Sequence, residues 1–111
     1  MKKKLKEVYT NCLRSRKGLP ALNYSDMWDL LAIANAAQRM GTDVIVAANP
    51  LVAKALGLEM CQSMVNAANA AVTVSLFNHL DHSSSVELAI DSIDAGFPSV
   101  MIDGSAKSLA E

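Results

Sequence analysis

The sequence predicts an α/β fold with about four parallel strands, a leading helix and three intervening helices. Apolar runs typical of buried strands begin near residues 19, 43, 72 and 98, so their starts lie roughly 24 to 29 residues apart. Apolar residues at helical spacing fill each interval. This repeat is typical of β/α units within one domain, here residues 1–111, with a leading helix in 1–17 and β/α units over 19–106.

The leading helix is predicted over 5–15, where apolar residues recur every three or four positions, and Gly18 is expected to end it. Residues 1–17 are strongly basic, with a net charge of +6, whereas the remaining residues carry −7. A basic segment can bind nucleic acid, but no recognition motif or further aromatic stacking residues accompany this one. The charges therefore favour a solvated helix face, and no nucleic-acid partner is expected.

Composition also limits the setting of the protein. No apolar run approaches the roughly 18 residues that a membrane crossing requires, and the basic N-terminus lacks the apolar segment of a secretory signal. Cys12 and Cys61 show neither metal nor redox spacing. These features predict a cytoplasmic protein with reduced cysteines and no membrane partner.

The first half of the chain contains two predicted strands and the helices that follow them. Residues 19–22 form a short apolar run pre-extended by proline, and Asn23 ends it, where its side chain can bond the turn. Ser25 or Asp26 then caps a helix that Gly41 ends. The strand over 43–48 is almost entirely apolar, which predicts cover on both faces. Asn49 suits the N-cap of the next helix, with proline at its first position.

The second half is a βαβ unit that follows a helical stretch interrupted at Gly57. Strands are predicted over 72–77 and 98–102, with a helix between them that begins at a Ser84–Glu87 capping box and ends at Gly96. The sequence HLDH, residues 79–82, is therefore expected just after one strand and Asp103 just after the next. Ligands of parallel sheets bind beyond these strand ends.

Taken alone, the two histidines are a weak metal signal. On an extended strand, residues three apart point to opposite faces, so His79 and His82 would chelate one ion only if the chain bends. Asp81 can equally be a turn residue, and His79 a hydrogen-bonded histidine of the core. Without its flanking sequence, HLDH favours structural roles for these residues.

The flanking sequence changes that preference. HLDH, followed about twenty residues later by DAGFPSVMIDGS, resembles the class II, metal-dependent ketose-bisphosphate aldolases, and the likeness extends from Leu19 to about Ala106. These enzymes are (β/α)8 barrels of about 250 residues or more. The resemblance implies a partial TIM barrel corresponding to the N-terminal half of such an enzyme.

The resemblance also implies roles for individual residues. Asp81 would be the catalytic acid/base, and His82 a ligand of Zn²⁺. Asn23 would lie in the substrate site. Many members have a serine or threonine near the position of Asn49 that contacts a substrate phosphate, so Asn49 departs from the pattern, although its hydrogen-bonding side chain is compatible with that role. Asp103 would have a supporting role at the barrel mouth. The implied reaction is zinc-dependent, reversible cleavage of fructose- or tagatose-bisphosphate into dihydroxyacetone phosphate and an aldehyde.

A half barrel is expected to be incomplete in two respects. The remaining zinc ligands and the phosphate-binding loops lie downstream in the resembling enzymes, so the chain alone is expected to be inactive. Its sheet would also expose two unpaired edges, which predicts self-association or a completing chain. The alternative from another functional class is a non-catalytic half barrel that acts as a binding or assembly module.

Overall fold

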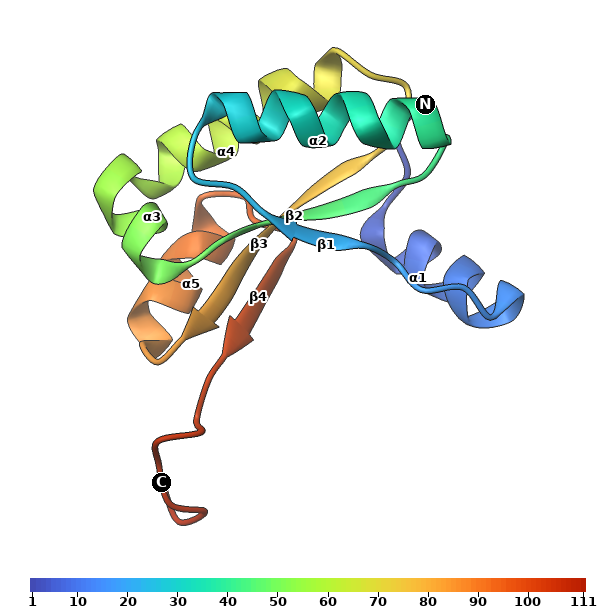
Figure 1. The fold of residues 1–111 in the computed structure, drawn as a ribbon. Coiled ribbons are helices and arrows are strands. Elements are labelled where there is room, and N and C mark those ends of the chain that lie inside the picture. The colour runs from blue at the N-terminus through green and yellow to red at the C-terminus, as the bar shows by residue number, and fades with distance from the viewer.

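A computed structural model describes all 111 residues, which form one parallel sheet and five helices (Figure 1). The sheet has the order β1-β2-β3-β4, and each strand pairs in parallel with the next. The strands are β1 (Ala21–Asn23), β2 (Val44–Ala48), β3 (Leu76–Ser83) and β4 (Ser99–Ile102). The helices are α1 (Leu5–Ser15), α2 (Met27–Met40), α3 (Pro50–Leu56), α4 (Leu58–Ala70) and α5 (Val86–Asp94). The predicted α/β architecture is confirmed, with four intervening helices in place of three.

Helices α2 to α5 cover one face of the sheet. Their buried side chains, among them Leu30, Val65 and Ala89, share one core cluster with Val46 of β2 and Leu80 of β3. Every residue of β2 is buried, which confirms the expected cover on both of its faces. The helices therefore fix the orientation of the central strands and leave the alternate side chains to the opposite face.

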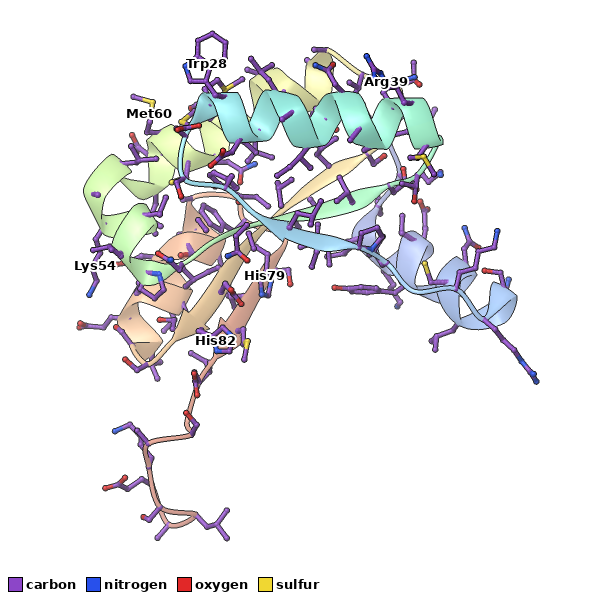
Figure 2. The ribbon with its side chains drawn as sticks, viewed as in Figure 1. Trp28, Arg39, Lys54, Met60, His79 and His82 are labelled. Carbon is purple, nitrogen blue, oxygen red and sulfur yellow. The ribbon has the colours of Figure 1, made fainter.

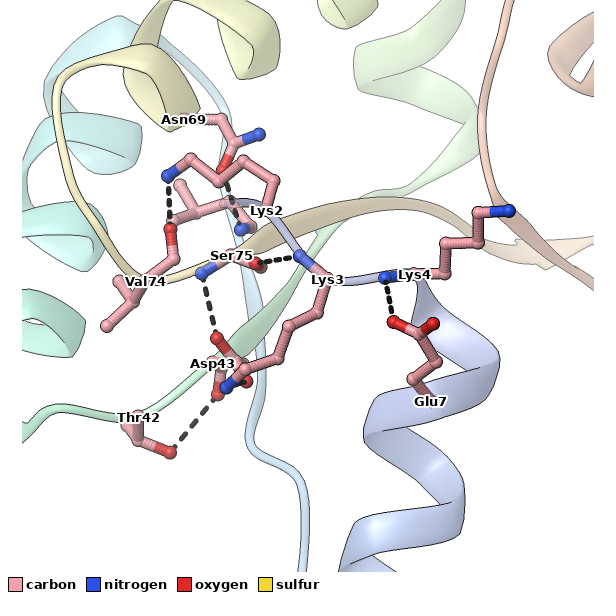
Figure 3. A network of polar contacts seen from close by, with 10 residues as sticks. Lys2, Lys3, Lys4, Glu7, Thr42, Asp43, Asn69, Val74 and Ser75 are labelled. Carbon is pink, nitrogen blue, oxygen red and sulfur yellow. Dashed lines mark hydrogen bonds and ion pairs between the residues drawn. The ribbon is translucent and has the colours of Figure 1, made fainter.

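Helix α1 covers the amino-terminal part of that opposite face. Val8 packs there with Ile45 of β2 and Phe77 of β3. Just before the helix, the Lys3 ammonium contacts Asp43 at 2.7 Å, and the Lys3 amide donates to the Ser75 hydroxyl at 3.0 Å (Figure 3). These contacts anchor α1 to the sheet end at which β2 and β3 begin.

Helix boundaries follow local capping chemistry. The side chains of Asp26 and Asn49 accept hydrogen bonds from the first turns of α2 and α3, as expected. Gly41 ends α2 in the left-handed conformation, also as expected. Gly57 has φ 87° and ψ 144°, a conformation that glycine tolerates best, and it divides the helical stretch into α3 and α4. This break accounts for the additional helix.

Two predicted caps are wrong by one or two residues. Ser85, and not Ser84, caps α5, because its hydroxyl accepts from the Leu88 amide at 3.1 Å. Helix α1 ends when Arg16 adopts the left-handed conformation, two residues before Gly18. In both places a residue close to the predicted one supplies the hydrogen bond or the left-handed turn.

The third strand is displaced from its predicted position. It begins at Leu76 and not near residue 72, because the Thr73 amide donates to the Gln38 side chain and the Ser75 amide to the Asp43 side chain. It then continues to Ser83 along β4. The sequence HLDH therefore lies inside β3, and the prediction that it follows the strand is wrong.

Asn78 places a polar side chain in the helix-covered core. It is 1% exposed, and its Oδ1 accepts from the Tyr24 hydroxyl at 2.9 Å while its Nδ2 donates to Gln62 Oε1 at 3.0 Å. The network ties the segment after β1 and helix α4 to β3. Burial is the main reason that the pKa of Tyr24 is raised far above its usual range, so its hydroxyl stays a proton donor.

Replacing Asn78 by Ala is expected to lower the free energy of unfolding by about 1–3 kcal/mol, because the buried Tyr24 hydroxyl and the Gln62 amide lose their partner. Urea unfolding followed by circular dichroism measures the change. Asn35→Ala, at an exposed position of α2, is the matched control and should change stability by less than about 0.5 kcal/mol. Equal effects of the two variants would contradict a stabilising role for the network.

Candidate functional site

Four side chains meet at the carboxyl-terminal edge of the sheet. Asn23 Nδ2, at the end of β1, donates to Asp81 Oδ2 at 3.2 Å. Asp81 Oδ1 lies 3.7 Å from His82 Nε2, and His82 Nδ1 lies 2.9 Å from Asp103 Oδ2, just beyond β4. Figure 2 shows His82 near the point where the chain leaves the sheet. The structure thus brings Asn23 and Asp103, which are far apart in sequence, together with the adjacent Asp81 and His82.

An irregularity in the pairing of β3 with β4 positions the adjacent Asp81 and His82. Leu80 pairs with Val100 and Ser83 with Ile102, so β3 advances three residues where β4 advances two. His82 takes a φ of 50°, in the left-handed region that side chains rarely adopt. The bulge overrides strict alternation, which allows consecutive side chains to share one polar cluster.

His79 lies deeper in the sheet and forms a separate pair. Asn23, Ala47, His79 and Ser99 are in register across the four strands, on the face opposite α2 to α5. His79 Nδ1 lies 2.7 Å from Ser99 Oγ. The bend at His82 does not bring the two histidines together, and no hydrogen bond joins His79 to the cluster at the edge.

Asn49 stands apart from the other predicted site residues. Its Oδ1 accepts from the Val52 amide at 3.0 Å and caps α3. This contact explains the residue structurally, and none of its hydrogen bonds leads to Asp81 or His82. The cap uses only Oδ1, so the Nδ2 group is the part of this side chain that could donate to a phosphate.

The cluster fits a zinc ion through one ligand. Because Asp103 holds Nδ1 of His82, Nε2 is the nitrogen available for a metal, and metal-binding histidines are commonly oriented by such a carboxylate. The His82 side chain is 60% exposed, so this nitrogen is accessible. No group of three His, Cys, Asp or Glu side chains in the chain could hold a metal ion. A catalytic zinc site usually has three protein ligands, so its other donors would have to come from beyond these residues.

The pKa values of the two histidines are shifted in opposite directions. The hydrogen bond that His82 Nδ1–H donates to Asp103, with the nearby charge of Asp81, raises the pKa of His82. Burial lowers the pKa of His79. Hydrogen bonds from Ser105, followed by that with His82, lower the pKa of Asp103 to about 2. Asp103 is therefore ionised throughout the pH range in which His82 titrates.

Two serines complete the hydrogen bonding but were not singled out in the sequence. Ser99 contacts His79, and the Ser105 amide donates to Asp103 Oδ1 at 2.9 Å. The Asp-Gly-Ser order is a recognisable signal for the second contact, because aspartate side chains often accept from the amide two residues later. The first depends on strand register, which the sequence left open.

Comparison with known proteins identifies the fold to which this edge belongs. A family model described as "Fructose-bisphosphate aldolase class-II" matches residues 3–111. The chain belongs to the class II fructose-bisphosphate aldolase family. It superimposes on the crystal structure of the YdjI aldolase from Escherichia coli K12 with a TM-score of 0.82, at 22% sequence identity, over all of this chain and 43% of that one. The expected partial barrel is confirmed.

Curated members of the family act on several substrates, according to their names. The chain is 37% identical over 110 residues to 6-phospho-5-dehydro-2-deoxy-D-gluconate aldolase of Bacillus subtilis, covering 96% of this chain and 38% of the relative. It is 32% identical over 106 residues to fructose-bisphosphate aldolase of Treponema pallidum, covering 91% and 32%. It is 30% identical to sulfofructosephosphate aldolase of Alkalicoccus urumqiensis, covering 96% and 37%. The chain thus spans less than two fifths of these relatives.

An NMR titration of the metal-free protein should resolve two histidines, with the pKa of His82 above 6.5 and that of His79 below it. Because its folded pKa is raised, His82 stabilises the fold at pH values below 6.5, and this contribution is lost as the pH rises through the folded pKa. The contribution of His79 to stability depends on pH in the opposite direction. It is present above pH 6.5 and is lost as the pH falls through the lowered pKa of His79.

The same titration tests the role of Asp103. Asp103→Asn should bring the pKa of His82 down toward 6.5 and leave that of His79 nearly unchanged, because His82 is the histidine that bonds this carboxylate. Asp91→Asn, which removes an exposed carboxylate from α5, is the matched control. A His82 pKa that responds equally to both variants would disprove the proposed pairing.

Proposed function

We propose that this chain supplies the acid/base and first metal-binding half of a class II aldolase site. The reaction would be the zinc-dependent, reversible aldol cleavage of a phosphorylated ketose, with fructose- or tagatose-bisphosphate as candidate substrates. The observation that carries the proposal is the Asn23–Asp81–His82–Asp103 cluster at the edge where barrel ligands bind. Family membership supports the reaction class.

Asp81 is the proposed proton-transfer group. In the cleavage direction, its carboxylate would take the proton from the hydroxyl of the carbon that becomes the aldehyde. Asn23 donates to Oδ2 and so fixes the carboxylate, while Oδ1 has no hydrogen bond and its side chain remains 23% exposed. The same contact places Asn23 beside the reacting groups, where its amide can also meet substrate.

His82 is the proposed zinc ligand, through Nε2, with Asp103 as the group that orients it. Zinc bound there would supply an electrophile for the charge that develops when the carbon–carbon bond next to the ketone breaks. The other metal donors and the phosphate-binding loops would come from outside these 111 residues. For this reason we propose that one copy of the chain is inactive by itself.

Asn49 is the weakest of the proposed substrate contacts, because its side chain caps α3. We still propose it as a phosphate contact because the start of α3 follows β2 directly, at the same end of the sheet as the cluster. Cys12 and Cys61 are both free thiols, which agrees with the cytoplasmic setting proposed for the protein. None of the helices has the length and apolar character required to cross a membrane.

A non-catalytic half barrel remains the second candidate function. It is favoured by the single histidine at the barrel mouth and by the open sheet edges. In that case, the cluster at the carboxyl edge would stabilise the bulge of β3 without taking part in a reaction. The two functions differ in what happens when the remainder of a barrel is supplied.

A chimeric protein would supply the remainder of the barrel. Joining this chain to the downstream segment of the 37%-identical Bacillus subtilis relative should give an aldolase active on 6-phospho-5-dehydro-2-deoxy-D-gluconate. Asp81→Ala should lower kcat at least about 100-fold while zinc content is kept, because proton transfer is lost. His82→Ala should lower both zinc content and kcat. Coupled aldehyde detection and metal analysis of the same samples measure these effects.

Asn35→Ala, in the exposed part of α2, serves as the control and should leave both readouts unchanged. A chimera that keeps its activity after Asp81→Ala would exclude the acid/base assignment. A folded, zinc-free and inactive chimera would favour the non-catalytic half barrel instead.

A further inference from the structure

The two open edges of the sheet expose apolar side chains that its centre buries. Val46 of β2 and Leu80 of β3 are 0% exposed, whereas Leu22 of β1 is 48% and Ile102 of β4 is 51% exposed. The pairing registers place Leu22 beside Val46, and Leu80 three residues before the Ser83 that pairs with Ile102. The outer side chains of both edge strands therefore lack the cover that a neighbouring β/α unit provides.

The helices nearest the two edges show the same feature. On α5, Val86, Ile90 and Ile93 follow each other at helical spacing and are each more than half exposed. On α2, which connects β1 to β2, Met40 is 78% exposed and Ala36 is also on the surface. An exposed apolar stripe of this kind marks an interface, because isolated domains normally bury it.

The segments that lead into the two edge strands carry opposite charges. Arg14, Arg16 and Lys17 precede β1, whereas Asp91 and Asp94 precede β4. None of these five has an ion-pair partner in the chain, where Lys3–Asp43 is the single contact between a lysine or arginine and a carboxylate. If a β4 strand paired in parallel with a β1 strand, the two oppositely charged segments would lie side by side.

We propose that a second copy of this chain occupies both edges, with β4 of each copy pairing with β1 of the other to close an eight-stranded barrel. Each α5 stripe would then pack beside α2 of the other copy. The inference rests on the proposed function in one respect, since it names the chain that completes the barrel. It also places a second His82 with its carboxylates at the same mouth, where one copy has too few metal donors.

The register of an eight-stranded barrel agrees with this arrangement. Asn23 lies in line with Ser99 across the four strands. A shear of eight residues around a (β/α)8 barrel corresponds to four over half of it. This offset sets Ser99 opposite Leu19 of the second copy, and hence Ile102 opposite Leu22. The two exposed apolar side chains of the edge strands would therefore cover one another.

Sedimentation equilibrium of the purified chain tests the proposal without any assay of activity. The expected mass is twice that of the 11.8 kDa chain. Ile90→Lys and Ile102→Lys should each raise the dimer Kd at least about tenfold, because a buried apolar contact is lost. Met60→Lys, at an exposed position of α4 away from both edges, should leave Kd unchanged. Circular dichroism verifies that each variant is folded.

A second measurement tests the strand pairing directly. In a Cys12→Ser background, Leu22→Cys combined with Ile102→Cys should give a covalent dimer upon mild oxidation, whereas Met60→Cys combined with Ile102→Cys should not. A monomer at micromolar concentrations, a dimer equally sensitive to all three lysine variants, or failure of the first cysteine pair to cross-link would overturn the proposal.

The outcomes separate this inference from the proposed function. A monomeric chain whose chimera is active would overturn the two-copy barrel and leave the proposed function intact. A chain that forms the cross-linked dimer, but whose chimera is folded and inactive, would support the two-copy barrel and exclude the proposed function.

Discussion

The parallel pairing of β3 with its two neighbours is the constraint on which the rest of the structure depends. Pairing with β2 fixes which side chains of β3 face the helices, and these include Leu80 and the hydrogen-bonded Asn78. Pairing with β4 fixes the bulge and hence the position of His82. Because all four strands run in the same direction, Asn23 and Asp103 arrive at the same edge as this bulge. The cluster is therefore a consequence of sheet topology.

The polar side chains of β3 and its neighbours form two groups, one buried under the helices and one exposed at the sheet edge. Asn78 and Tyr24 are buried on the helix side, where each buried polar group has a partner. Asp81, His82 and Asp103 lie at the edge, where the His82 side chain is largely exposed. The buried group holds the strand in place, and the exposed group is free to meet a ligand. An uncommon backbone conformation at His82 in such a place is typical of functional sites.

The sequence predicted most of the fold because its signals are local. The caps at Asp26, Asn49 and Gly41, the apolar run of β2 and the strand-helix repeat each depend on a few neighbouring residues. The displaced start of β3 was not predictable in this way, since it depends on Gln38 and Asp43 taking the backbone amides of Thr73 and Ser75. The bulge at His82 likewise depends on a register with β4. Non-local pairing therefore limited the prediction at the very strand that carries the site.

The candidate residues show the same division. Family resemblance proposed Asn23, Asp81, His82 and Asp103, and the structure joins all four, whereas it gives Asn49 a capping contact. The preferred nitrogen of His82 could come only from the structure, because it depends on the contact with Asp103. That preference carries most weight, since it turns a histidine at a strand end into an oriented candidate for a metal ligand.

The most direct test is a zinc titration of the chimera, in which the downstream segment supplies the other metal donors, followed by long-range ¹H–¹⁵N correlation of His79 and His82. The account predicts that added Zn²⁺ shifts the Nε2 resonance of His82 while its Nδ1 keeps the proton shared with Asp103, and that His79 is unaffected. A zinc-dependent shift at Nδ1 of His82, a shift centred on His79, or no response from either ring would contradict it.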